Sequence, residues 1–410
     1  MNKPKSPRLR FPNISKELTA NSLNELSLLV TSGSRDWAQF YSISGAKFIR
    51  MTNLRRGSPV LDLEELKYVC VPKTSRDGFR TKLEHGDVLV SITAELGKIG
   101  LVPKDIGDAY INQHVALVRP KKSELCGFLA HYLTAPQTYK RLNRLNDSGA
   151  KSGLNLSTLK AFPVHRPETD ECRKVTDFLT SVDTKISQLT EKHRLLKEYK
   201  KGVMQQIFSQ QICFSDDGGE AFPKWTENRL DYFIERVSNP VDLATGVEYR
   251  EIGIRSHGKG IFHKNPVTSS DIGNKRVFWV KEKALVLNIV FAWERAVAVT
   301  SDSESGFIAS HRFPMYLPKE NRADVSYLLY FLLSPKGTRL LNIASPGGAG
   351  RNKTLGQSEF AKLKVCLPSL KEQQKIAQFL QSIDTKIEGV AKQVEQTKQF
   401  KKGLLQQMFV

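Results

Sequence analysis

Two stretches of the sequence decide the fold: residues 167–208, which contain VTDFLTSVDTKI and KKGVMQQIF, and residues 368–409, which contain IAQFLQSIDTKI and KKGLLQQMF. A constant shift of 201 residues (368 − 167) aligns them without a gap, and 17 of the 42 aligned positions are identical. An internal repeat of this kind constrains the architecture of a chain more strongly than any single motif does. The sequence therefore predicts a duplicated unit with one long helix in each copy.

Apolar residues recur in both stretches at alternating steps of four and three. A period of 3.5 residues is typical of the seam of a coiled coil, whereas the core-facing side of an ordinary helix is broader. The predicted seam consists of Val175, Leu179, Val182, Ile186 and Leu189 in the first helix and of Ile376, Leu380, Ile383, Ile387 and Val390 in the second. At ~1.5 Å per residue, roughly 40 residues make a helix of about 60 Å. Each helix is therefore expected to act as a spacer.

Composition narrows the class of protein. The 410 residues suffice for two or three domains, and no apolar run reaches the length of a membrane span. The N-terminal MNKPKSPRLR lacks the apolar segment of a secretory signal, and the five cysteines form no CxxC pair, so we expect reduced thiols in the cytoplasm. A net charge of +20 favours a polyanionic partner, and a merely basic soluble protein is the alternative that charge alone leaves open.

The segments outside the repeat share an order of elements. In the first segment, residues 46–54, 85–102 and 110–120 have the alternation and β-branched content of strands, and residues 126–145 have helical spacing that Pro136 interrupts. The second segment repeats this order with weak identity, including a helix with a matching Pro335. We therefore divide the chain into mixed α/β domains at 1–166 and 211–366 and helical regions at 167–210 and 367–410. The helices are shared between the copies, and the globular surfaces differ.

No catalytic or metal-binding constellation emerges. The sequence GGAGRNKT (347–354) has Asn352 where a phosphate-binding loop needs glycine before its lysine. The segment SNPV (238–241) lacks the aromatic residue that follows Asn-Pro in amino-methyltransferase sites. The eight histidines have no HxxxH or HExxH spacing, and His114 and His311, at equivalent places, are interpreted as structural. We predict no catalytic residue, no metal and no cofactor.

These residues carry a family resemblance. The arrangement resembles the DNA-specificity (S) subunits of type I restriction-modification systems, in which two variable target-recognition domains alternate with two similar helical regions. The resemblance covers the whole chain. Its most specific parts are LPSLKEQQKIAQFLQSIDTKI (367–387), the first copy RPETDECRKVTDFLTSVDTKI and the KKGxxQQxF helix ends. The first copy departs from the pattern because Cys172 replaces the glutamine of the EQ pair, which leaves Glu171 alone.

The resemblance implies a fold, a function and partners. The long helices would pack as an antiparallel coiled coil with an internal pseudo-twofold repeat, within an α/β (α+β) architecture. The protein would be a non-catalytic subunit that binds double-stranded DNA, two methyltransferase (M) subunits and, through them, restriction (R) subunits. No membrane would be among its partners. S-adenosylmethionine, ATP and Mg²⁺ would bind to those partners.

Basic and amide side chains on the predicted turns are the candidates for DNA contact, because such groups supply both phosphate contacts and base-edge hydrogen bonds. For each one, a solvated surface charge is the alternative interpretation. The candidates are Arg50, Asn53, Arg55, Arg56 and Lys151 in the first domain and Arg250, Arg255, Lys259, Arg351 and Lys353 in the second.

Two other classes of function stay open at this point. One is a non-catalytic coiled-coil scaffold with two ligand-binding domains, and the other is a nuclease or methyltransferase in its own right. The missing motifs speak against the enzyme. Sequence-specific binding to duplex DNA together with a methyltransferase partner would separate a specificity subunit from both alternatives.

Overall fold

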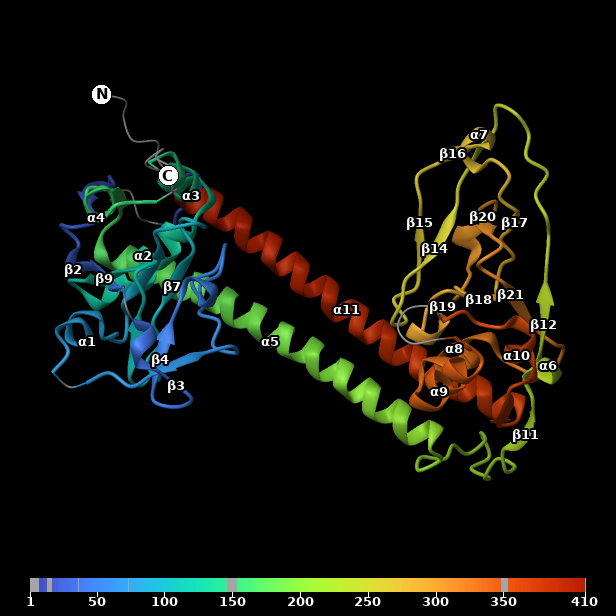
Figure 1. Cartoon of the computed structure of the whole chain (residues 1–410). Helices are drawn as coiled ribbons and strands as arrows, with labels where there is room; N and C mark the ends of the chain where they lie inside the picture. Colours follow the sequence, from blue (N-terminus) through green and yellow to red (C-terminus); the bar gives the residue numbers. More distant parts are fainter. Residues whose placement is uncertain are drawn as a thin grey trace. The chain divides into compact units, whose positions relative to one another are not determined.

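The computed structural model describes residues 7–12, 17–35, 37–72, 74–145, 153–347 and 353–409. It divides into two compact units: unit 1 consists of residues 1–192 and 390–410, and unit 2 of residues 193–389. The two long helices, α5 (Thr169–Phe208) and α11 (Leu370–Met408), each begin in one unit and end in the other (Figure 1). Each compact unit thus combines a globular segment with part of both helices, whereas the sequence-based division treats the helices as separate regions.

Unit 1 is built from short strands and short helices around the beginning of α5 and the end of α11. Its strands are β1 (Thr19–Ser22), β2 (Ser27–Ser32), β3 (Tyr41–Ser42), β4 (Ala46–Ile49), β5 (Lys67–Val69), β6 (Val88–Ser91), β7 (Ile99–Leu101), β8 (Ala109–Ile111), β9 (Val115–Pro120) and β10 (Pro163–Arg166). Its shorter helices are α1 (Arg76–Thr81), α2 (Ser123–Thr134), α3 (Pro136–Arg144) and α4 (Leu156–Lys160). The strands form a sheet of order β2-β9-β6-β7, a second of order β3-β5-β4-β8, and the pair β1-β10.

Unit 2 repeats much of this plan. Its strands are β11 (Thr226–Arg229), β12 (Ile234–Val237), β13 (Glu248–Tyr249), β14 (Ile252–Ile254), β15 (Ile261–His263), β16 (Val267–Thr268), β17 (Val277–Trp279), β18 (Leu285–Leu287), β19 (Val297–Val299), β20 (Ile308–Ser310), β21 (Met315–Pro318) and β22 (Lys364–Leu367). Its shorter helices are α6 (Leu230–Phe233), α7 (Ser269–Ile272), α8 (Val325–Leu333), α9 (Pro335–Ile343) and α10 (Gln357–Lys362). The sheet β12-β21-β18-β19 corresponds to β2-β9-β6-β7, and the pair β11-β22 corresponds to β1-β10. The duplication therefore extends beyond the helices to the central sheets.

The predicted strand at residues 110–120 is wrong in one respect, because it is two strands in different sheets. β8 pairs in parallel with β4, whereas β9 lies between β2 and β6. A turn separates them, in which the Val115 amide donates to the Asn112 carbonyl. Ile111 and Val115 are both buried. The apolar pattern therefore continues through the turn and gives no sign of the break.

The predicted interruption of each short helix by proline is confirmed. Pro136 opens α3 directly after α2, and Pro335 opens α9 directly after α8. Proline is tolerated in the first turn of a helix because the missing N–H has no intrahelical partner there. In unit 2 the Ser334 side chain also accepts a hydrogen bond from the Gly337 amide and caps the new helix. Each proline thus starts a second helix.

The core of unit 1 joins the globular segment to both long helices. Buried residues of α2, among them Phe128 and Leu129, share one apolar cluster with Leu179 of α5 and with Leu405 and Phe409 at the end of α11. Gly127 shows how closely α2 approaches α5, because a Cβ there would lie 2.2 Å from Cγ2 of Thr176. A buried segment of this kind contributes about 25 cal/mol per Å² of apolar surface removed from water. The helices are therefore part of the core.

In both units, the start of one long helix lies beside the end of the other. In unit 1 the Lys401 ammonium of α11 contacts the Asp183 carboxylate of α5, and in unit 2 the Lys200 ammonium of α5 contacts the Asp384 carboxylate of α11. The C-terminal ends of the two long helices also make equivalent backbone hydrogen bonds. The Leu9 amide donates to the Gln407 carbonyl, and the Ile212 amide donates to the carbonyl of Gln206, which aligns with Gln407.

Most residues of the predicted seam are buried in the unit to which they belong. Ile186 is the exception, because it is only half-buried and packs at the margin of the unit 1 core. The buried members are Val175, Leu179, Val182 and Leu189 in α5 and Ile376, Leu380, Ile383, Ile387 and Val390 in α11. Among the described residues, no helix has the combination of length and apolar content that crossing a membrane requires.

Leu179 and Leu380 occupy equivalent, fully buried positions of the two copies, so truncating either one tests the role of the helices in the core. We expect Leu179→Ala or Leu380→Ala to lower the free energy of unfolding by about 2–5 kcal/mol, because each change leaves a cavity. Chemical denaturation followed by circular dichroism measures the change. Leu195→Ala, at an exposed position of α5, is the control and should have little effect. Equal, small effects of all three changes would contradict a core built on the helices.

Candidate nucleic-acid interface

The basic turn of unit 1, residues 55–58, follows β4 after a short 3-10 helix at Met51–Asn53 and lies close to the long helices. The Arg55 guanidinium pairs with the Asp62 carboxylate at 2.9 Å, and the Arg56 guanidinium lies 4.1 Å from the centroid of the Tyr139 ring of α3. Both arginines are exposed. The next residues, Gly57 and Ser58, approach α11 and α5. Each of these guanidinium groups thus contacts the protein and is also accessible to solvent.

Asn53, a predicted DNA contact, is buried within its own turn. Its side chain is 2% exposed, its Oδ1 accepts from the Arg50 amide at 2.9 Å, and its Nδ2 donates to the Asp62 carbonyl at 2.9 Å. Both the oxygen and the nitrogen of the Asn53 amide are therefore hydrogen-bonded to backbone groups of its own loop. Arg50 itself is half-buried, and its Nη2 lies 3.4 Å from the Glu65 carbonyl. The sequence could not distinguish an amide that faces solvent from one that satisfies the backbone.

In unit 2 the hairpin β14–β15 carries two predicted contacts, Arg255 and Lys259, which are both exposed. The Arg255 guanidinium donates to the Ile261 carbonyl at 3.1 Å and lies 4.7 Å from the Phe262 ring centroid. Gly258 and Gly260 of the turn have φ of +65° and +76°, a conformation that side chains with a Cβ rarely adopt. The turn therefore presents Lys259 between two glycines.

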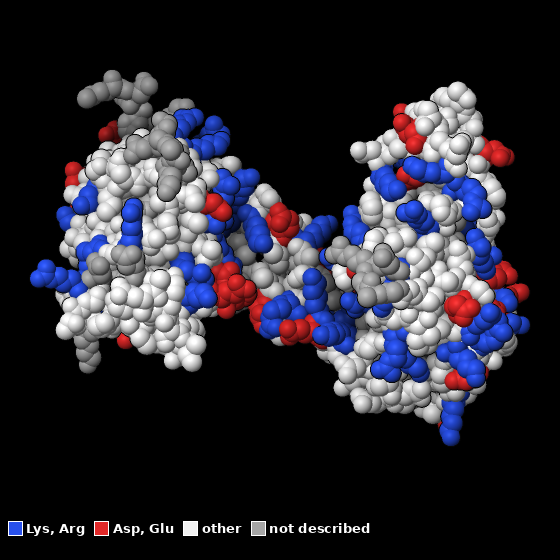
Figure 2. Space-filling view, viewed as in Figure 1, with Lys and Arg blue, Asp and Glu red and all other residues white. Residues whose placement is uncertain are grey.

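The remaining candidates in unit 2 are dispersed. Arg250 is exposed and its guanidinium lies 5.9 Å from the Phe307 ring, whereas Lys353 is half-buried with its ammonium 5.5 Å from the Trp293 ring. Lys151 and Arg351 lie outside the described residues. Figure 2 shows lysine and arginine side chains spread over the viewed face of both units, with acidic residues among them. On the viewed face, the basic side chains are thus dispersed among acidic and uncharged residues.

A buried carboxylate, Glu304, joins the β14–β15 hairpin to the segment of residues 301–304. The sequence did not reveal it. Glu304 Oε1 lies 2.8 Å from Nε2 of His263 at the end of β15, and Glu304 Oε2 accepts from the amide and hydroxyl of Ser301 at 2.8 Å. Burial opposes ionisation of Glu304, but hydrogen bonds from Ser303, His263 and Ser301 outweigh it and lower its pKa to about 2. The charged form therefore stabilises this part of unit 2.

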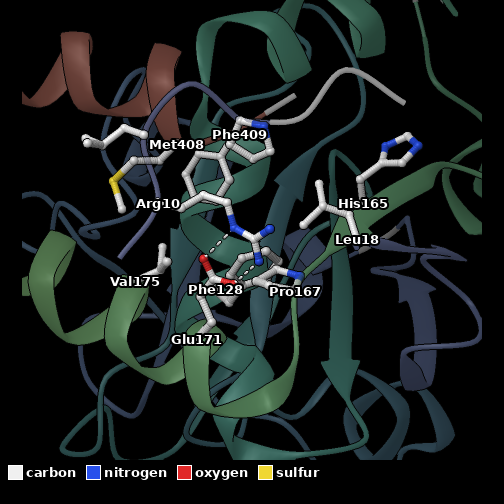
Figure 3. Close-up of a pocket in the computed structure, with 11 residues that line it drawn as sticks. Arg10, Leu18, Phe128, His165, Pro167, Glu171, Val175, Met408 and Phe409 are labelled. Atoms are coloured by element: carbon white, nitrogen blue, oxygen red, sulfur yellow. Dashed lines mark hydrogen bonds and ion pairs between the residues drawn. The ribbon is translucent and has the colours of Figure 1, made fainter. Parts of the chain in front are cut away.

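Each long helix also carries a buried carboxylate at its start, Glu171 in α5 and Glu372 in α11. In unit 1 the Arg10 guanidinium makes two hydrogen bonds to Glu171, Nε to Oε1 at 3.0 Å and Nη2 to Oε2 at 2.5 Å (Figure 3). The surrounding cavity measures only about 10 Å³, room for about one water molecule. In unit 2 the equivalent Glu372 accepts from the Trp225 indole at 3.2 Å. This position of the repeat thus binds a residue that precedes the first strand of its unit, and that residue is Arg10 in unit 1 and Trp225 in unit 2.

The residue after this carboxylate explains the irregular first copy of the motif. In unit 2 the buried Gln373 side chain accepts from the Asp324 amide and donates to the carbonyls of Arg322 and Pro368. In unit 1 the buried Cys172 thiol lies 3.5 Å from the carbonyl of Pro167, the counterpart of Pro368. Burial raises the pKa of this thiol to about 12, which keeps it neutral. Cysteine therefore retains one of the three contacts.

Among the described residues, no group of three or more His, Cys, Asp and Glu side chains lies together in a metal-binding arrangement. The five cysteines are all free thiols. The site that the structure offers is therefore a set of exposed basic turns on two similar α/β units.

Comparison with known proteins places this arrangement in a family. A family model described as the type I restriction modification DNA specificity domain matches residues 61–198 and 212–398. The chain belongs to this family, and it has the architecture of a specificity subunit with two such domains.

Relatives agree with this assignment. The putative type I restriction enzyme MjaX specificity subunit of Methanocaldococcus jannaschii is 23% identical over 375 residues, 84% of this chain and 82% of that protein. The MjaVIII specificity subunit of the same organism is 23% identical over 265 residues, 58% of this chain and 59% of that protein. The chain is thus a type I restriction-modification specificity subunit.

Solved structures show the same fold. The type I restriction-modification S subunit from M. genitalium superposes with a TM-score of 0.57 at 13% identity and 99% coverage of both chains. A chain from a structure of type I R-M complex assembly and conformational transition gives a TM-score of 0.51 at 15% identity, with 97% of this chain and 98% of that chain covered.

The charged state of Glu304 gives a pH prediction. Because its pKa falls from an ordinary value of 4.5 to about 2 on folding, its contribution to stability is complete above pH 4.5 and is lost as the pH falls toward 2. We expect Glu304→Gln to lower the free energy of unfolding by about 2 kcal/mol at pH 7. The difference from the wild type should narrow between pH 4.5 and 2.

Urea denaturation over this pH range measures the effect. Glu359→Gln, at an exposed glutamate of α10, serves as the control and should show almost no difference at any pH. A Glu304→Gln difference that is constant from pH 7 to pH 2 would show that the carboxylate does not carry the stabilisation.

Proposed function

We propose that this specificity subunit recognises a bipartite sequence in double-stranded DNA, with unit 1 reading one half-site and unit 2 the other. The observation that carries the proposal is the duplication: two units share their central sheets and helices but differ in the basic turns they expose. A shared plan with different reading surfaces fits a target whose two halves differ in sequence. The net charge of +20 supports a polyanionic partner.

The exposed basic side chains can serve two purposes in this function. Arginine and lysine contacts to phosphates supply affinity and position the protein, and arginine can also read guanine through two hydrogen bonds in the major groove. The described candidates that are exposed are Arg55 and Arg56 in unit 1 and Arg250, Arg255 and Lys259 in unit 2. Lys353 is half-buried and is therefore less able to reach a base edge.

In the complex, the subunit would act without catalysing a reaction itself. We propose that it binds two methyltransferase (M) subunits and, through them, restriction (R) subunits. S-adenosylmethionine would bind to the methyltransferase subunits, and ATP and Mg²⁺ to the restriction subunits. The specificity subunit then determines where the partners act, and the long helices, shared by both units, are the natural surface for a partner that binds twice.

Methylation mapping tests the proposal directly. With its cognate M subunit expressed in a host that lacks both genes, the chain should direct adenine methylation to a two-part sequence with a fixed gap. The M subunit without this chain should leave that sequence unmethylated, and the purified chain alone should neither methylate nor cleave DNA. Methyl transfer by the isolated chain, or a pattern that does not depend on it, would contradict the proposal. A coiled-coil scaffold would give no pattern.

The hairpin of unit 2 gives a second test. We expect Arg255→Ala combined with Lys259→Ala to weaken binding of the chain–M complex to its target and to reduce the slope of log K against log [salt] by about 1–2, because up to two phosphate contacts are lost. Fluorescence anisotropy with a labelled duplex at several salt concentrations measures both effects. Lys362→Ala, whose ammonium pairs with Glu359, is the control. An unchanged slope would exclude the hairpin from the interface.

A further inference from the structure

The repeat places an aspartate and a lysine on each long helix, and the pairs form between the helices. Asp183 aligns with Asp384, and Lys200 aligns with Lys401, each by the same shift of 201 residues. In unit 1 the Lys401 ammonium contacts Asp183 Oδ1 at 2.6 Å and Oδ2 at 2.7 Å. In unit 2 the Lys200 ammonium contacts Asp384 at the same two distances. Each unit thus contains one ion pair made by residues from opposite copies.

In unit 1 the pair also contacts the basic turn. The Ser58 hydroxyl donates to Asp183 Oδ1 at 3.3 Å, and the Lys401 ammonium lies 3.5 Å from the Gly57 carbonyl. Gly57 and Ser58 directly follow Arg55 and Arg56 in the chain. The ion pair therefore fixes one end of the turn that carries the two exposed arginines.

In unit 2 the contact comes from a helix instead of a turn. The Tyr330 hydroxyl of α8 donates to Asp384 Oδ2 at 2.7 Å, and the Lys200 ammonium lies 4.9 Å from the Tyr330 ring centroid. Three residues further along α8, Leu333 packs against the hairpin turn, because a Cβ on Gly258 would lie 2.8 Å from Leu333 Cδ2. The pair in unit 2 is therefore connected through one helical turn to the hairpin that carries Lys259.

The pair in unit 1 is more deeply buried than stability alone would favour. The Lys401 and Asp183 side chains are 3% and 7% exposed, against 21% and 34% for Lys200 and Asp384. Burial raises the pKa of Asp183 and lowers that of Lys401, and the attraction between them does not reverse either change. Replacing such a buried pair by apolar residues is often neutral or stabilising, so its use lies in specifying one geometry.

A titratable side chain of α2 also faces this pair. His131 of α2 faces it with Nδ1 3.9 Å from Asp183 Oδ2, and burial lowers the pKa of His131 to about 3, so this ring is neutral near pH 7. His131 and Tyr330 occupy equivalent places, five residues before Pro136 and Pro335 respectively. The third partner has therefore changed between the copies, while the aspartate and lysine have not.

We infer that these ion pairs are positioning groups for DNA recognition: Asp183–Lys401 with Ser58 sets the basic turn of unit 1, and Asp384–Lys200 with Tyr330 sets the hairpin of unit 2. The inference rests on the proposed function, because it assigns each pair to one half-site. Base recognition requires side chains to be held within about 0.5 Å of their working geometry. A contact that fixes the turn or the helix behind it therefore affects which bases are accepted.

Removing single hydroxyl groups tests the inference with little risk to folding. Ser58→Ala and Tyr330→Phe leave both ion pairs in place and remove the hydroxyl that joins each aspartate to its recognition segment. Ser58→Ala also removes the acceptor of a hydrogen bond from the Val60 amide within the same turn. With the cognate M subunit present, we expect each variant to relax discrimination at one half-site and to leave the other unchanged, and the two variants should affect opposite halves. A loss of about tenfold in discrimination at the affected bases corresponds to the smaller effects of single mismatches.

Lys401→Met and Lys200→Met extend the test to the pairs themselves, with Asp183→Asn added to Lys401→Met so that no uncompensated buried charge remains. These variants should relax the same half-sites as Ser58→Ala and Tyr330→Phe, respectively. Methylation mapping reports the bases accepted, and thermal unfolding reports stability separately. Lowered stability with unchanged specificity, or equal relaxation at both half-sites, would overturn the positioning role. A wild-type chain that directs no two-part methylation pattern would instead overturn the proposed function.

Discussion

The core of each unit depends on an aromatic residue at the end of a long helix. In unit 1 the Phe409 ring packs edge-on against Phe128 and Tyr132 of α2, with centroids 5.6 Å apart in both cases. In unit 2 the equivalent Phe208 packs against Tyr327 and Phe331 of α8 at 5.8 and 5.9 Å. Aromatic pairs of this geometry add to the stabilisation that burial itself provides. Because each ring closes a core, the globular segment of each unit shares that core with its own parts of the two long helices.

The sequence predicted the duplication, the long helices and the proline breaks, because these depend on periodicity and local backbone chemistry. It did not predict the division into units, since periodicity does not show where a helix enters a neighbouring core. The exposure of the candidate DNA contacts could not be predicted for a different reason. Arg55 and Lys259 are exposed, whereas Asn53 is buried within its own turn, and nothing in the residue type separates these cases. Contacts across long sequence separations, such as Asp183 with Lys401, had one signal: both residues recur in the repeat.

The two copies show which features the architecture requires and which can vary. The aspartate, the lysine and the helix-end phenylalanine are retained, whereas Gln373 becomes Cys172 and the place of Tyr330 is taken by His131. The retained aspartate and lysine pair between the helices, and the retained phenylalanine packs on α2 or α8. The groups around them vary, so the surroundings of each retained contact can differ between units that recognise different sequences.

The position of Phe409 has a consequence for synthesis. It meets Phe128, which lies 281 residues earlier in the chain (409 − 128), so the core of unit 1 stays incomplete until residues 390–409 have left the ribosome. Unit 2 spans only residues 193–389, and all of its parts are available sooner. At about 5–20 residues per second, unit 1 waits roughly ten seconds or more between the synthesis of α2 and the arrival of its closing residue. During that interval the apolar surface of Phe128 and Tyr132 that Phe409 covers in the folded protein has no partner.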